Sequence, residues 1–156
     1  MTDFAALLAP ADGQTSVPLI PLTKAGLDGW LATQGERVRV AVAAQDFTAA
    51  PDSIIILPGD GPADWSVAAG VSEGPLGPWS LAAAAAKLPA GRYALHGELG
   101  QAGLGWCLAQ HRFSRYRKAD AKGARVLTTT SLGAITSAVR EAQAVALVRD
   151  LVDTPA

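Results

Sequence analysis

The stretch RVLTTTSLGAITSAVREAQAVALVRDLVDTPA, residues 125–156, is the part of the chain that decides the fold. It predicts a short strand, Arg125–Thr130, followed by a long helix that begins at Ser131. The Ser131 hydroxyl can accept a hydrogen bond from an amide of the first helical turn. Pro155 ends the helix, because the residue before a proline is pushed out of the helical region. A single apolar stripe along the first half predicts one buried face: Leu132, Ile135, Val139, Ala142 and Ala146.

The second half of this helix has a different pattern, since its apolar residues spread around most of the circumference. They are Val145, Leu147, Val148, Leu151 and Val152. A helix that is apolar on nearly all sides is usually covered on more than one side. We therefore expect a further structural unit to pack against this end of the helix.

Upstream of residue 125, short strand patterns alternate with helix patterns. Residues 1–16 show no period and are expected to form an irregular lead. The expected strands are 17–22, 37–42, 53–57, 64–71 and 92–96. The first is an edge strand at best, because it holds two prolines, and the strand at 53–57 is expected to be buried on both faces. The expected helices are 24–34, 79–88 and 106–115. Thr23 is expected to cap the first of them, and Gly35 to end it in a left-handed conformation. This alternation predicts one α/β domain with helices flanking a sheet.

Composition excludes several classes of protein. The chain has 156 residues, which suits one domain, and its net charge of −1 gives no general case for binding nucleic acid or an anionic membrane. It has a single cysteine, Cys107, so no internal disulfide is possible. The N-terminus lacks the basic region of a signal peptide, and the apolar runs are too short to span a bilayer. These features predict a cytoplasmic protein.

Two motifs resemble the leucyl (cytosol) aminopeptidase family. The segment VRDLVDTPA, residues 148–156, resembles the opening of the family's catalytic half, with Asp153 where an Asn is usual. The segment LGWCLAQHRFSRYR, residues 104–117, is similar to a Leu-Gly-Trp and aromatic-Arg-Phe pattern of bacterial members, with His111 where a Tyr is common. The residues that fit the family are Leu104, Gly105, Trp106, Arg112, Phe113, Tyr116, Arg149, Asp150, Leu151 and Pro155.

The resemblance implies a macro-domain-like, mixed β-sheet domain at residues 17–130 and a helix at 131–156 that leads to a catalytic domain absent from this sequence. It also implies that the parent is a two-metal exopeptidase, in which two divalent ions, Mn or Zn, polarise the scissile carbonyl of a peptide substrate and activate water. Family members are commonly hexamers. We expect this chain alone to be inactive and to serve assembly and active-site access, with its own catalytic domain as partner. No catalytic, metal or cofactor residue is assigned to it.

Other candidate sites give weaker signals. The glycines Gly97, Gly100, Gly103 and Gly105 follow a strand, but Leu108 stands where a dinucleotide fingerprint needs its third glycine. Cys107 and His111 lie four residues apart and could share a helix face, yet zinc needs three or four ligands. A buried thiol and a packed imidazole are the simpler interpretation. The loop carboxylates Asp60, Asp64 and Glu73 form no convincing catalytic pair.

A cluster of cations lies beside Phe113 and Tyr116 and consists of Arg112, Arg115, Arg117 and Lys118. It favours a solvated helix end over a nucleic-acid interface, because the net charge is near neutral. The tryptophans lie on separate elements, so they are expected in the core rather than on one stacking surface. They are Trp30, Trp65, Trp79 and Trp106. The alternative function is a stand-alone α/β module that binds a nucleotide-like ligand through the glycine loop, or nucleic acid through the basic helix.

Overall fold

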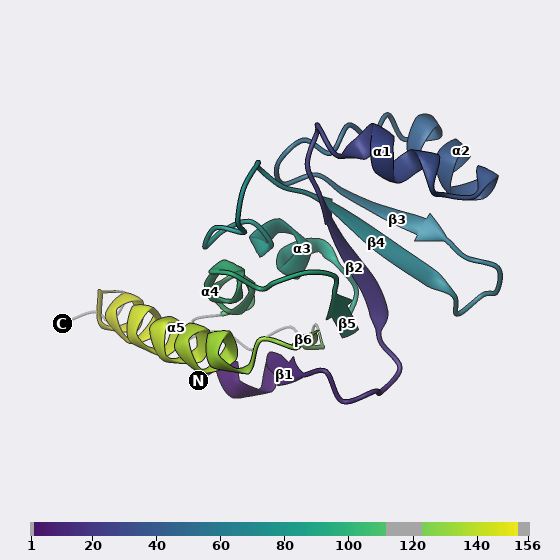
Figure 1. Cartoon of the computed structure of the whole chain (residues 1–156). Helices are drawn as coiled ribbons and strands as arrows, with labels where there is room; N and C mark the ends of the chain where they lie inside the picture. Colours follow the sequence, from purple (N-terminus) through teal and green to yellow (C-terminus); the bar gives the residue numbers. More distant parts are fainter. Residues whose placement is uncertain (1, 112–122, 153–156) are drawn as a thin grey trace.

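The computed structural model (Figure 1) describes residues 2–111 and 123–152. A 3-10 helix, η1, spans Phe4–Ala6. The strands are β1 (Leu8–Pro10), β2 (Val17–Leu22), β3 (Ile54–Pro58), β4 (Trp65–Gly70), β5 (Gly91–Leu95) and β6 (Arg125–Thr129). The α-helices are α1 (Leu27–Ala32), α2 (Glu36–Ala44), α3 (Ala82–Lys87), α4 (Ala102–Leu108) and α5 (Leu132–Val152).

The six strands form one sheet in the order β1-β6-β5-β2-β4-β3. All neighbouring strands are parallel except β3 and β4, which pair antiparallel. This mixed sheet with flanking helices confirms the predicted α/β class, and β4 lies within the strand expected at residues 64–71.

Helices cover both faces of the sheet (Figure 1). On one face, α3, α4 and α5 pack over a core that includes Leu19, Tyr93 and Leu127. On the other face, α1 and α2 pack over a smaller core that includes Ile55 and Leu57. Successive residues of a strand point to opposite faces, so each central strand supplies both cores.

The expectation of an irregular lead was wrong for part of residues 1–16. Within that segment, η1 and β1 are regular, and β1 pairs with β6 from Leu8↔Leu127 to Pro10↔Thr129. A three-residue strand that ends in proline has no period of its own. Its pairing is specified by β6, more than a hundred residues later in the chain.

The expectation that residues 17–22 form an edge strand was also wrong, because β2 lies between β5 and β4. Its register explains how two prolines are tolerated there. β2 pairs with β5 over Val17–Leu19 and with β4 over Leu19–Leu22. Pro18 and Pro21 therefore each lie where β2 has one paired neighbour, and a missing N–H donor can face the other side.

The alternation at residues 37–42 predicted a strand, but these residues belong to α2. Helix α2 buries Val42 and packs Val38 and Ala41 against the smaller core, which is the three- and four-residue spacing of a helix face. Gly35 is the N-cap of α2 in an extended conformation (φ −67°), and not the predicted left-handed end of α1. α1 begins at Leu27 rather than at the predicted residue 24, and its N-cap is Gly26 rather than Thr23. Thr23 instead supports the turn before α1, since its Oγ1 accepts a hydrogen bond from the Gly26 amide at 3.0 Å.

The expectation that residues 53–57 form a strand buried on both faces was wrong. β3 is the terminal strand of the sheet, and it buries Ile55 and Leu57 on the face that α1 and α2 cover. Ile56 points to the opposite face and is 47% exposed. A run of apolar residues cannot show which face of an edge strand has a cover.

The helices on the larger core differ from prediction at their starts and, for α4, also at its end. α3 begins at Ala82 rather than residue 79, and α4 begins at Ala102 rather than Trp106. α4 also ends at Leu108, well before the predicted end at residue 115, because residues 109–111 are not helical. In α5, the predicted buried stripe is correct for Ala142 and Ala146, but Leu132 is 60% exposed. The Ser131 carbonyl accepts hydrogen bonds from the Ala134 and Ile135 amides, which places Ser131 at the start of α5.

Candidate functional site

The described residues of the two family-like motifs lie on α4 with the residues just after it, and on α5, and these two helices pack against each other. Leu104, Gly105 and Trp106 belong to α4, whereas Arg149 and Leu151 lie in the last turns of α5. Trp106 is fully buried, and its indole Nε1 donates a hydrogen bond to the Arg125 carbonyl at 3.0 Å. Of the other predicted motif residues, Arg112, Phe113, Tyr116 and Pro155 lie outside the described residues.

His111 and Asp150 join the two motifs directly. The His111 Nε2 atom lies 3.1 Å from Asp150 Oδ1, and its Nδ1 atom lies 3.0 Å from Thr2 Oγ1. The imidazole packs on Phe4 with a centroid distance of 5.6 Å, and its side chain is 8% exposed. His111 is therefore a packed imidazole that ties the N-terminal segment and the chain after α4 to the last turns of α5. No sequence pattern pointed to the participation of Thr2.

The glycine run is explained by close packing and not by a phosphate site. Gly103 and Gly105 lie inside α4, which begins earlier than predicted. A Cβ atom on Gly103 would lie 2.6 Å from the Ala138 Cβ of α5, and one on Gly105 would lie 2.2 Å from the Pro78 carbonyl oxygen. Gly97 and Gly100 lie in the preceding loop with φ of 104° and 52°, a region that favours glycine.

The residues that the structure describes do not fit a metal ion. Cys107 is fully buried among apolar residues, and burial raises the pKa of its thiol to about 12. A thiol with so high a pKa is a poor ligand or nucleophile, since both roles need the thiolate. Among the described residues, no group of three or more His, Cys, Asp and Glu side chains could hold a metal.

The remaining candidates give no catalytic arrangement in the described part of the chain. Asp64 Oδ2 accepts a hydrogen bond from the Asp60 amide at 3.1 Å, so this pair serves the turn before β4. Trp30 and Trp65 pack against the two cores as predicted, but Trp79 is 52% exposed and corrects that expectation. The basic cluster lies outside the described residues. No described helix combines the length and apolar character needed to cross a bilayer.

The last turns of α5 present an exposed apolar surface. Its residues are Leu147, Val148, Leu151 and Val152, with exposed fractions of 56%, 61%, 67% and 78%. The opposite side of the same helix segment buries Ala142 and Ala146 in the larger core. We call this surface the α5 apolar end. The sequence predicted that this half of the helix carries apolar residues on more sides than one domain covers, and the exposure of these four side chains agrees with that prediction.

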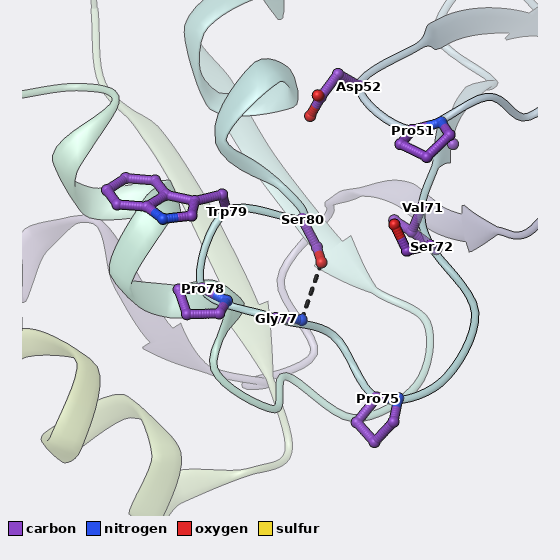
Figure 2. A pocket seen from close by; sticks show the side chains of 10 residues that line it. Pro51, Asp52, Val71, Ser72, Pro75, Gly77, Pro78, Trp79 and Ser80 are labelled. Atoms are coloured by element: carbon purple, nitrogen blue, oxygen red, sulfur yellow. Dashed lines mark hydrogen bonds between the residues drawn. The ribbon is translucent and has the colours of Figure 1, made fainter.

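Sequence reasoning missed a crevice at the carboxyl end of β4 (Figure 2). It has a volume of about 320 Å³ and lies between the loop before β3 and the loop before α3. Pro51 and Asp52 line it on the first side, and Pro75 and residues 77–80 line it on the second. No local pattern could have shown it, because its walls come from two loops about 20 residues apart.

Comparison with known proteins identifies the family. The model of the M17 aminopeptidase N-terminal domain matches residues 17–129. No curated protein matches the sequence. Among solved structures, the cytosol aminopeptidase from Coxiella burnetii is similar, with a TM-score of 0.81 and 22% sequence identity over 96% of this chain and 34% of that one.

Two further solved structures share the fold at lower similarity. The bottromycin maturation enzyme BotP has a TM-score of 0.65 and 18% identity over 90% of this chain and 33% of its own. A mutant of tomato leucine aminopeptidase has a TM-score of 0.57 and 18% identity over 95% of this chain and 38% of its own. The chain thus spans about a third of the length of these relatives. The family model matches most of the chain and corresponds to the N-terminal domain of these proteins. The chain therefore belongs to the M17 family of metal-dependent aminopeptidases.

Proposed function

We propose that this chain is the non-catalytic domain of a leucyl aminopeptidase-like two-metal exopeptidase, and that it assists assembly and access to the active site. Its partner is its own catalytic domain, which carries the two divalent ions, Mn or Zn, and removes N-terminal amino acids from peptides. The BotP structure determined in complex with Mn supports the choice of metal for a relative of this fold. We further propose that the full-length protein forms a hexamer and is located in the cytoplasm.

The α5 apolar end is the observation that carries this proposal. Four large apolar side chains, each more than half exposed, lie together on the last two turns of one helix. Contiguous exposed apolar surface of this kind marks an interaction site in soluble proteins. The relatives continue well beyond the matched region, so a second domain is available to cover it.

The His111–Asp150 contact supports a role for the same helix end in domain placement. It holds the last turns of α5 against the segment after α4 and against Thr2 at the N-terminus. A helix fixed at this point would present the α5 apolar end in one orientation. That is what a rigid connection between two domains requires.

The first test is the reading frame beyond the codon for Ala156. The proposal expects it to continue for roughly twice the length of this chain, as the relatives do, with clustered Lys, Asp and Glu residues. A native stop codon at that point would refute the proposal.

The second test compares substitutions on α5. Leu147→Asp and Leu151→Asp should change the stability of the isolated chain by less than about 0.5 kcal/mol, because both side chains are exposed. In the longer gene product they should expose the α5 end to hydrogen exchange and lower leucine release. Ala142→Asp is the matched control on the buried face and should destabilise both forms. Loss of stability in the isolated chain with Leu151→Asp would contradict the proposed docking.

A further inference from the structure

The crevice of Figure 2 lies where an open α/β sheet places its ligand sites. β2 and β4 are parallel neighbours, but the chain leaves them toward opposite faces. After β2 it enters α1 and α2 over the smaller core, and after β4 it enters α3 over the larger core. Ligands of open α/β sheets bind outside the carboxyl ends of the strands at such a switch in direction. The crevice begins at Gly70, the last residue of β4.

The walls of the crevice are held in place by backbone contacts. The Asp52 amide donates to the Gly70 carbonyl at 3.1 Å, and the Gly70 amide donates to the Ser53 carbonyl at 2.8 Å. On the other wall, Ser80 Oγ accepts a hydrogen bond from the Gly77 amide at 2.9 Å, as Figure 2 shows. Asp52 has a φ of 67°, in the left-handed region, which Asp adopts more readily than most non-glycine residues. These contacts hold the backbone of the loop before β3 against Gly70, and this positions the Cα of Asp52 at the crevice.

The lining defines the chemistry of a ligand. Among the described lining residues, Asp52 alone carries a charge, and its side chain is exposed. Its carboxylate makes no hydrogen bond or ion pair within the described part of the chain. Pro51, Pro75 and Pro78 supply apolar surface, whereas Val71 is buried in the larger core. An anionic ligand such as a phosphate finds a negative charge and no described cation there, whereas an ammonium group finds a charged acceptor.

We propose that this crevice binds a small organic cation, a primary ammonium group carried on a compact apolar body. The ammonium donates to the Asp52 carboxylate, and the apolar body lies against the prolines of the lining. The volume of about 320 Å³ is at the lower end of the range for ligand pockets, which restricts the ligand to a small molecule. The site is independent of the domain contact proposed for the α5 apolar end.

The test is a titration of the isotopically labelled chain, followed by backbone amide chemical shifts. The probes are 3-methylbutylamine and leucinamide, each added to about 20 mM to detect millimolar dissociation constants. The uncharged control is 4-methylpentanamide, which keeps the apolar body and lacks the ammonium. Saturable shifts at Asp52 and at residues 70–80 are expected with at least one amine. Binding of leucinamide alone would identify a peptide-type amine as the ligand, and binding of both would identify a simple aliphatic amine.

Two variants make the result specific. Asp52→Asn should weaken amine binding by about tenfold, because it replaces a charge-assisted hydrogen bond with a neutral one. Asn also tolerates the positive φ, so the fold should persist. Asp60→Asn removes the same charge from an exposed turn outside the crevice and should bind as the parent does. Absence of shifts with both amines, equal binding of the uncharged amide, or unchanged affinity in Asp52→Asn would each overturn the proposal.

Discussion

Replacing Gly103 with alanine tests whether the contact between α4 and α5 sets the positions of both family-like motifs. In a helix, glycine to alanine normally gains up to about 1 kcal/mol from backbone entropy. At Gly103 the new methyl group would lie 2.6 Å from the Ala138 Cβ and 3.3 Å from side-chain atoms of Leu8 and Leu99. Inserting a methyl group into a packed site costs about 1–3 kcal/mol. We therefore expect Gly103→Ala to be neutral or destabilising by up to about 2 kcal/mol.

Gly133→Ala is the matched control, because Gly133 lies in α5 and its Cβ would meet nothing within 4 Å. This variant should be stabilised by up to about 1 kcal/mol. The two variants should therefore differ by about 1–3 kcal/mol in urea denaturation followed by circular dichroism. In thermal unfolding, each kcal/mol corresponds to about 2–4 °C for a domain of this size.

A double-mutant cycle connects the effect to the named contact. In an Ala138→Gly background the clashing methyl group is absent, so Gly103→Ala should cost less than in the parent chain, with a coupling of about 0.5–3 kcal/mol. If Gly103→Ala gained as much stability as Gly133→Ala, the close approach of α4 and α5 would be refuted as the reason for glycine at this position.

Three further predictions concern single sites. His111→Gln and Asp150→Asn should be coupled by about 0.5–1.5 kcal/mol in a double-mutant cycle of the unfolding free energy, because His111 Nε2 lies 3.1 Å from Asp150 Oδ1. Additive effects of the two substitutions would show that this contact contributes nothing to stability. Burial raises the pKa of Cys107 from 9.0 to about 12. The free energy of unfolding should therefore be unaffected by this thiol below pH 9 and should fall by about 1.4 kcal/mol per pH unit between the two pKa values. Cys107→Ala should reduce this dependence of the unfolding free energy on pH, and an unchanged dependence would contradict the raised pKa. Gly70→Ala would place Cβ 2.0 Å from the Ala50 carbonyl oxygen and should destabilise by about 3 kcal/mol or more, which unfolding midpoints would show.

The regular patterns of the sequence were sufficient for most of the larger core. The apolar runs that became β4, β5 and β6, and the long helix α5, were predicted with small errors at their ends. In each case a local pattern and its tertiary environment agree, because both faces of the central strands are covered. The two family-like motifs were also readable as sequence, since residue identity alone carries them.

The errors occurred where a local pattern had two solutions. Val38 and Val42 satisfy the alternation of a strand and the spacing of a helix face, and contact with β3 favours the helix. Ile56 continues an apolar run, yet it lies on the uncovered face of an edge strand. The prolines of β2 indicated an edge, but the stagger of its two neighbours places them in a central strand.

By itself, the sequence determined the α/β class, the family-like motifs and the excess of apolar residues at the end of α5, because these depend on residue type and short periods. Only the tertiary structure decided the place of β1 beside β6, the contact of His111 with Asp150 and Thr2, and the crevice beside Asp52. Each of these joins residues that are distant in the chain or lie on separate loops. Such contacts depend on how the sheet is ordered and which faces are covered, and a local pattern contains neither.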